Sequence, residues 1–135
     1  MNDLVLEWIT VAEGDFRYAL LGLKTKDALV YNGVCFHCQQ CIEKYLKALL
    51  VREQIYFEKK HDLIYLLDLL LPTDPTMEFF REELKMLTDY AVDIRYPGDH
   101  ADYAEATLAV RRTKALRKAL REKLGLAKPW AKRRK

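Results

Sequence analysis

The sequence predicts an all-α fold, an antiparallel up-and-down bundle of four long helices and one short helix. Apolar residues recur every three to four positions along most of the chain, which is the spacing of one helix face. No segment alternates apolar and polar residues with a period of two, as a half-buried strand would. Gly and Pro number only five and four in 135 residues, so the breaks between helices are few.

The first two predicted helices span residues 4–23 and 28–54. Gly22 and the polar run "KTKD" end the first. Gly33, inside the second, predicts that another backbone approaches closely there. The second helix has an apolar stripe formed by Val34, Cys38, Cys41, Ile42, Tyr45, Leu46, Leu49 and Leu50. Its other side carries the polar residues Gln39, Gln40, Glu43, Lys44 and Lys47. For Gln40, Glu43, Lys44 and Lys47 we expect a solvated face, with a subunit contact or a nucleotide-facing surface as the alternatives.

Capping signals place the other three helices. Asp62 is an N-cap for a short helix that stops at Pro72. Asp74 followed by Pro75 predicts the start of a helix over 76–94. The run "RYPGD" then interrupts the chain, and a last helix covers 101–124, ending at Gly125 in the C′ position. Either Asp99 or Asp102 could cap it.

Three cysteines and a histidine within "CFHCQQC" raise the question of a metal site. Thiols three residues apart on a helix rotate steadily around it, so Cys35, Cys38 and Cys41 cannot all point at one tetrahedral centre. Structural zinc sites pair short spacings from two segments, and the chain has no second cysteine pair. We therefore predict no metal and no cofactor, and small apolar packing roles for the cysteines.

Charge divides the chain into two parts. Residues 111–135 hold twelve Lys or Arg and one acid, Glu122, whereas the first 110 residues hold eleven bases and nineteen acids. A basic end can bind a polyanion, although a solvated helix face with a loose tail explains it equally well. We expect one domain over 1–126 and a flexible basic tail over 127–135. The apolar run over 63–71 is too short to span a bilayer. The start of the chain carries acids and lacks the positively charged region that a signal peptide would have, so we expect a cytoplasmic protein.

Three segments carry a family resemblance. "CFHCQQCIEKYLKALL" resembles the signature helix of HEPN domains (higher eukaryote and prokaryote nucleotide-binding), in which alanine usually stands at the cysteine positions. "KKHDLIYLLDLL" is similar to the family's K-x-H-D-L-x-x-L-L segment, and "LTDYAVDIRYPGD" is similar to its helix end followed by R-Y-P. The resemblance covers about residues 4–124.

The resemblance implies that the chain is a metal-independent ribonuclease with an Arg-x4-His motif, here Arg95 and His100. A histidine can move a proton at a ribose hydroxyl, and an arginine can bind the phosphate and stabilise the charge that develops on it. The candidate catalytic residues are therefore Arg95 and His100, and the candidate nucleotide- or RNA-binding residues are Arg95, Tyr96, Arg111 and Arg112.

The resemblance also implies partners. HEPN domains of this kind form homodimers in which both Arg–His pairs line one cleft, and they act as toxins beside a minimal nucleotidyltransferase antitoxin. In some pairs the antitoxin adenylylates a tyrosine in a His-x-Tyr pattern. This chain has Tyr103 one residue further on, which makes Tyr103 a candidate modification site or a packing residue at the end of the bundle. The alternative function is a non-catalytic module that docks the nucleotidyltransferase or binds nucleotide or RNA.

Overall fold

The computed structural model describes residues 1–90 and 99–126, and this part of the chain is all helical, as predicted. The α-helices are α1 (Asp3–Thr25), α2 (Tyr31–Arg52), α3 (Leu63–Leu70), α4 (Arg81–Tyr90) and α5 (Tyr103–Lys123), and a 3₁₀ helix, η1 (Pro75–Phe80), precedes α4. Residues of the predicted tail, 127–135, lie outside the described part. No described helix is long and apolar enough to cross a membrane.

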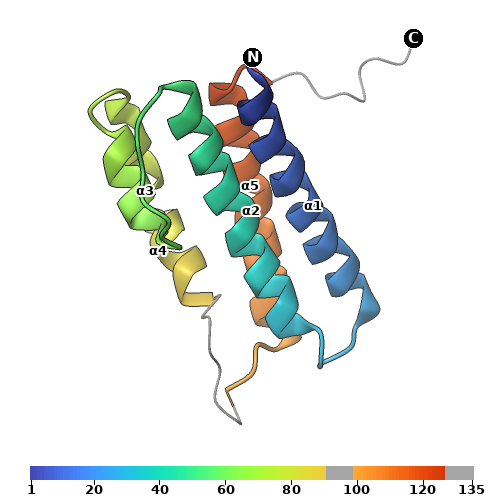
Figure 1. The fold of residues 1–135 in the computed structure, drawn as a ribbon. Helices are drawn as coiled ribbons and strands as arrows, with labels where there is room; N and C mark the ends of the chain where they lie inside the picture. The colour runs from blue at the N-terminus through green and yellow to red at the C-terminus, as the bar shows by residue number, and fades with distance from the viewer. Residues whose placement is uncertain (91–98, 127–135) are drawn as a thin grey trace.

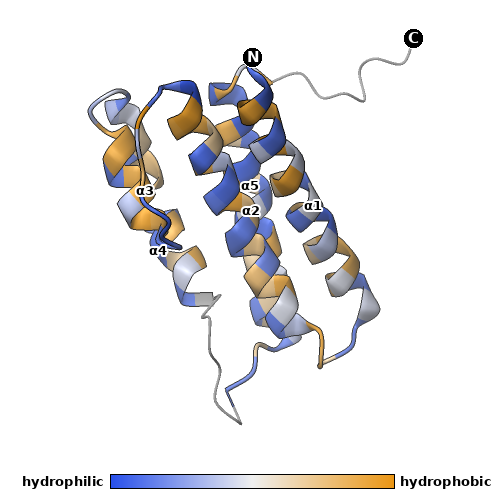
Figure 2. Ribbon diagram, viewed as in Figure 1, coloured by the Kyte–Doolittle hydropathy of each residue, from blue (hydrophilic) through white to orange (hydrophobic). Residues whose placement is uncertain are grey.

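Helix α2 is the centre of the bundle. It contacts α1, α3, α4 and α5, and Figure 1 shows it between α1 on one side and the α3–α4 pair on the other. Apolar positions turn toward these neighbours, while a hydrophilic band crosses the middle of α2 (Figure 2). The prediction for the cysteines is confirmed, because Cys35, Cys38 and Cys41 are completely buried in the core and remain thiols. The described residues hold no group of His, Cys, Asp and Glu that could bind a metal ion.

One connection departs from simple up-and-down order. After α2 the chain returns along the bundle through residues 53–62, so that α3 runs in the same direction as α2 (Figure 1). The return is fixed at two places. Ile55 N donates to Leu50 O at 2.9 Å, and the Tyr65 hydroxyl accepts from Glu58 N at 3.0 Å. This return brings His61 back to the middle of α2.

The capping predictions succeed at three helix starts. Asp62 accepts hydrogen bonds from Ile64 N and Tyr65 N, both at 3.1 Å. Asp102, and not Asp99, caps α5 by accepting from Glu105 N at 2.8 Å. Asp74 accepts from Thr76 N at 3.1 Å, as expected of a cap, but the turn that it opens is 3₁₀ and the α-helix begins only at Arg81. The predicted end of this helix at Ile94 lies outside the described residues.

Of the two glycines predicted to end a helix, Gly125 does so and Gly22 does not. Gly125 has a φ of 81° and ends α5 as predicted. Helix α1, however, continues past Gly22 to Thr25 and ends at Lys26, whose φ is 54°. The close approach expected at Gly33 occurs at Gly22 instead. A Cβ on Gly22 would lie 2.7 Å from Val34 Cγ2, whereas a Cβ on Gly33 would meet open space.

A charged cluster joins α1, α2 and α5. Arg117 donates two hydrogen bonds to the Glu13 carboxylate, both 2.7 Å, and the Tyr45 hydroxyl donates to the same carboxylate. Arg121 in turn donates to the Tyr45 oxygen at 3.0 Å. Burial alone would raise the pKa of Glu13, but the hydrogen bonds from Arg117 and Tyr45 outweigh it, so this pKa lies below its ordinary value.

Replacing Gly22 tests the crossing of α1 and α2. We expect Gly22→Ala to lower the free energy of unfolding by about 1 kcal/mol, because the strain of the added methyl against Val34 exceeds the gain in helix propensity. Gly33→Ala is the matched control and should raise it by roughly 0.5–1 kcal/mol, since nothing opposes its methyl group. Urea unfolding of both variants measures the difference. Equal effects would contradict the close approach at Gly22.

Replacing Glu13 tests the charged cluster through its pH dependence. A carboxylate with a lowered folded pKa stabilises the protein above its unfolded pKa of about 4.3 and loses this contribution as the pH falls through the folded value. We expect Glu13→Gln to cost about 1–2 kcal/mol at pH 7. The difference in the free energy of unfolding between the variant and the parent protein should disappear on acidification below pH 4. A gap that stays constant down to low pH would contradict the role of the charge.

Candidate functional site

The only member of the predicted Arg-x4-His pair within the described residues is His100. Its side chain is exposed and lies in the short segment that leads into α5. The next residue anchors this segment, because Ala101 is 3% exposed and its N–H donates to Asn32 Oδ1 on α2 at 2.8 Å. The imidazole of His100 is thus open to solvent, on a segment whose backbone is anchored at one end of the bundle. Arg95 and Tyr96 lie outside the described residues, so the Arg95–His100 distance stays a prediction.

The start of α5 is not an empty anion site. The Asp102 carboxylate accepts from Glu105 N, so an acid already occupies one of the amide groups that the helix N-terminus could offer to a phosphate. A phosphate near His100 would therefore depend on cationic side chains more than on the helix terminus.

Two aromatic residues and a lysine lie at the same end of the bundle. The rings of Tyr31 and Tyr103 are 5.7 Å apart, and Lys26 Nζ lies 5.4 Å from the centre of the Tyr103 ring. Tyr103 remains 45% exposed, so the candidate modification site combines ring packing with an accessible side chain. Sequence reasoning missed Lys26, which the left-handed turn after α1 brings beside α5.

The basic side chains of α5 fall into two groups. Four of them pair within the fold: Arg112 with Glu83, Arg117 with Glu13, Arg121 with Tyr45 and Lys123 with Asp74. Three others, Arg111, Lys114 and Lys118, are exposed at a spacing of three and four residues and thus share one face. Arg111 lies about 12 Å along α5 from its first residue. Of the two predicted RNA-binding arginines on α5, Arg111 is exposed, whereas Arg112 pairs with Glu83 and joins α4 to α5.

The polar side of α2 is not the solvated face that we expected. Glu43 is 1% exposed and Lys47 is 7% exposed, with their Oε2 and Nζ atoms 2.9 Å apart. His61, on the returning connection, places Nδ1 2.9 Å from the same Glu43 oxygen, and the Trp8 and Phe57 rings cover Lys47. The expectation was wrong because the connection over 53–62 covers this side of the helix.

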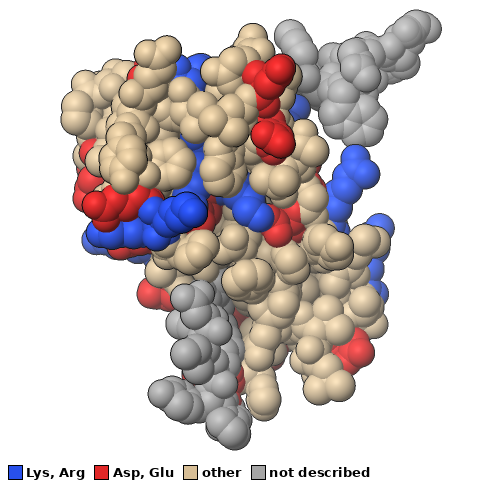
Figure 3. Space-filling view, in the orientation of Figure 1, with Lys and Arg blue, Asp and Glu red and all other residues tan. Residues whose placement is uncertain are grey.

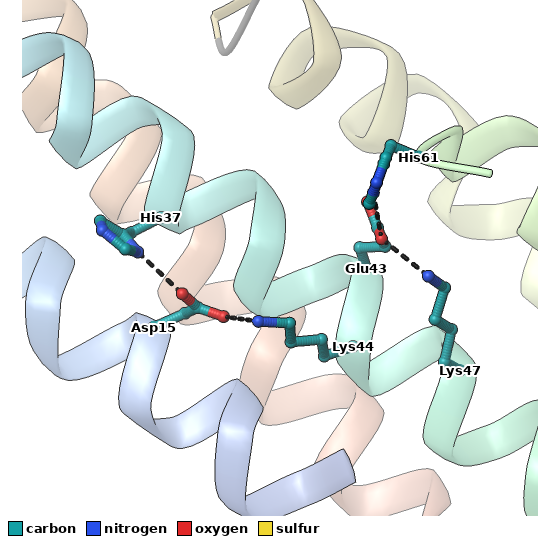
Figure 4. A network of polar contacts seen from close by, with 6 residues as sticks. All are labelled: Asp15, His37, Glu43, Lys44, Lys47 and His61. Carbon is teal, nitrogen blue, oxygen red and sulfur yellow. Dashed lines mark hydrogen bonds and ion pairs between the residues drawn. The ribbon is translucent and has the colours of Figure 1, made fainter. Parts of the chain in front are cut away.

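A second carboxylate is paired in the same way between α1 and α2. Asp15 is 7% exposed, and its two oxygens lie 2.7 Å from His37 Nδ1 and 2.7 Å from Lys44 Nζ. The Tyr18 ring stacks on His37 at 4.9 Å. Figure 4 shows both clusters, each with a carboxylate between one imidazole and one lysine. Each carboxylate fixes the orientation of an imidazole, but the two clusters lie apart and neither includes His100.

One comparison with known proteins identifies the family. The family model for the HEPN domain matches residues 5–123, which include all three motif segments. No curated protein matches the chain, and no solved structure matches it.

Replacing Glu43 tests whether this polar cluster is structural. We expect Glu43→Gln to lower the free energy of unfolding by about 3–5 kcal/mol, because it leaves the buried Lys47 ammonium without its counter-charge. His61→Ala is the control, since its side chain is 64% exposed, and it should cost less than about 1 kcal/mol. Urea unfolding at neutral pH measures both. A Glu43→Gln protein as stable as the parent would show that the ion pair contributes little.

Proposed function

Because the chain belongs to the HEPN domain family, we propose that it is a metal-independent endoribonuclease, with His100 as the proton-transfer group and Arg95 as the phosphate-binding group. The exposed imidazole of His100, on a segment anchored to α2 through Ala101, is the observation that supports this role most directly. General acid–base catalysis needs such a side chain, fixed at its backbone and accessible to the substrate.

The proposed reaction is a transfer within the RNA backbone. The ribose 2′-oxygen attacks the adjacent phosphorus, the bond to the 5′-oxygen breaks, and the phosphate becomes a 2′,3′-cyclic diester. His100 takes the proton from the 2′-hydroxyl or gives one to the leaving 5′-oxygen. The Arg95 guanidinium binds the phosphate oxygens and stabilises the negative charge that builds on them. A second pair from a homodimer would double these groups around one phosphate.

The exposed bases of α5 support RNA as the substrate. Arg111, Lys114 and Lys118 form a row that leads away from the end of the bundle that carries His100, and phosphates of a bound strand can pair with such a row. Tyr103 and Lys26, beside His100, offer a ring for a base to stack on and a cation for a phosphate. We assign Arg112 the lesser part in RNA binding because Glu83 already pairs with it.

We further propose that the nuclease is a cytoplasmic toxin held in check by a nucleotidyltransferase partner. The exposed Tyr103 supports this pairing, since its hydroxyl could take a nucleotidyl group from a nucleoside triphosphate with release of pyrophosphate. The added phosphate would place negative charge beside the site for the RNA phosphate and oppose binding.

A non-catalytic binding module is the second candidate. The Asp102 carboxylate at the start of α5 favours it, because an acid two residues from His100 works against a second negative charge at the same place. In that case the chain would dock the nucleotidyltransferase without cleaving RNA.

Cleavage of total RNA in EDTA separates the two candidates. We expect the purified parent protein to cut RNA without metal and His100→Ala to cut it about 10²–10⁴-fold more slowly, because proton transfer is lost. His61→Ala is the control, since this exposed histidine lies on the connection beside α2, and it should cut at the parent rate. An intact RNA sample with the parent protein, or equal rates for parent and His100→Ala, would rule out the nuclease and leave the binding module.

A further inference from the structure

Helix α1 presents an apolar stripe to solvent. Leu4, Val11 and Tyr18 follow one another at intervals of seven residues and are 50%, 44% and 64% exposed. Leu21 continues the stripe at 62%. An interval of seven keeps side chains nearly in line along a helix, so these residues form one continuous strip, where a surface helix normally carries polar side chains.

Two hollows lie along this strip. The first, of about 230 Å³, is lined by Leu4, Glu7, Trp8 and Val11. Residues at these four spacings form the hole that receives a side chain in helix-on-helix packing. The second, of about 320 Å³, lies where the end of α1 meets the start of α2 and includes Leu21, Gly22 and Leu29. Between them is Gly14, where a Cβ would meet open space. Figure 3 shows an uncharged area over the lower halves of α1 and α2.

We propose that this strip is the contact surface for α1 of a second copy of the chain, with the two helices antiparallel. A two-fold axis between Val11 and Gly14 brings Tyr18 of one copy over the hollow between Leu4 and Val11 of the other. It also brings Leu4 over the second hollow, beside Leu21. Both contacts occur twice, because a two-fold interface uses the same surface on each copy.

The charges on α1 decide the direction. The exposed acids Asp3 and Glu7 lie in its first half, and the exposed bases Arg17 and Lys24 lie in its second half. Antiparallel pairing places the acidic half of each copy against the basic half of the other, whereas parallel pairing would place like charges together. Parallel pairing would also set Leu4 against Leu4 and Tyr18 against Tyr18, away from the hollows. This match of charge and shape within one helix identifies the occupant as a second copy of the chain.

The pairing does not depend on RNA cleavage. Lys26 contacts Tyr103, so the end of α1 lies beside the start of α5 and His100. Antiparallel helices would therefore carry the two His100 residues at opposite ends of the pair. The α1 contact is separate from the contact that would join two Arg95–His100 pairs around one phosphate, and either can exist without the other.

Cysteine cross-linking tests the direction. Leu4→Cys and Leu21→Cys proteins, carrying tags of different size, are mixed and oxidised with diamide. We expect a disulfide between the two different variants and none within either variant alone. The parent protein is the control and should give no cross-link, because its three cysteines are fully buried. A cross-link within Leu4→Cys alone would show parallel pairing, and no cross-link in any sample would refute the contact.

The mass of the assembly tests the surface itself. We expect Val11→Glu to halve the mass measured by sedimentation equilibrium, because the change sets two carboxylates near the axis while circular dichroism stays unchanged. Phe79→Glu is the matched control, since Phe79 is 85% exposed on η1, away from α1, and it should leave the mass unchanged. A Val11→Glu protein with the parent's mass, or a parent protein that is already monomeric, would overturn the proposal.

Discussion

The burial of α2 on nearly every side is the constraint on which the rest of the structure depends. Helix α2 contacts every other α-helix of the described residues, so little of its surface is exposed to water. Its polar side chains must therefore find partners within the protein. Glu43 is paired with Lys47 and His61, and Lys44 and His37 share Asp15 of α1. These pairs join α1 and the connection over 53–62 to α2, and Asn32 of α2 anchors the segment of His100 separately.

Much of the fold could be predicted from local signals. Asp62, Asp102 and Gly125 act at helix ends as their residue types predict, and the thiols of α2 are buried as their helical spacing indicates. Tertiary contact explains the error at Gly22. Gly22 looked like a helix end, but α1 continues, and α2 packs so closely there that a Cβ on Gly22 would lie 2.7 Å from Val34 Cγ2. The return of the chain before α3 likewise involves a tertiary contact, since His61 on it pairs with Glu43 of α2.

Less of the candidate site could be predicted. The motif singled out His100, which is exposed, and its catalytic role stays a prediction. The sequence did not indicate Lys26 as part of the site. Lys26 reaches Tyr103 because its own backbone is left-handed, a conformation that lysine does not favour. The burial of Glu43 and Lys47 was also missed. Their side of α2 has a polar sequence, and the residues that cover it, His61 and Trp8, come from other segments of the chain.

The three thiols of α2 have a consequence for oxidative stress. Oxidants and disulfide exchange act on the thiolate, and burial raises the pKa of Cys38 to about 12 and that of Cys41 well above its ordinary value. The folded chain therefore offers peroxide almost no reactive thiol at neutral pH. Once α2 separates from its neighbours, three thiols within seven residues become available together. Oxidised cysteine in this chain would thus mark molecules that had already unfolded, and would trap them in that state.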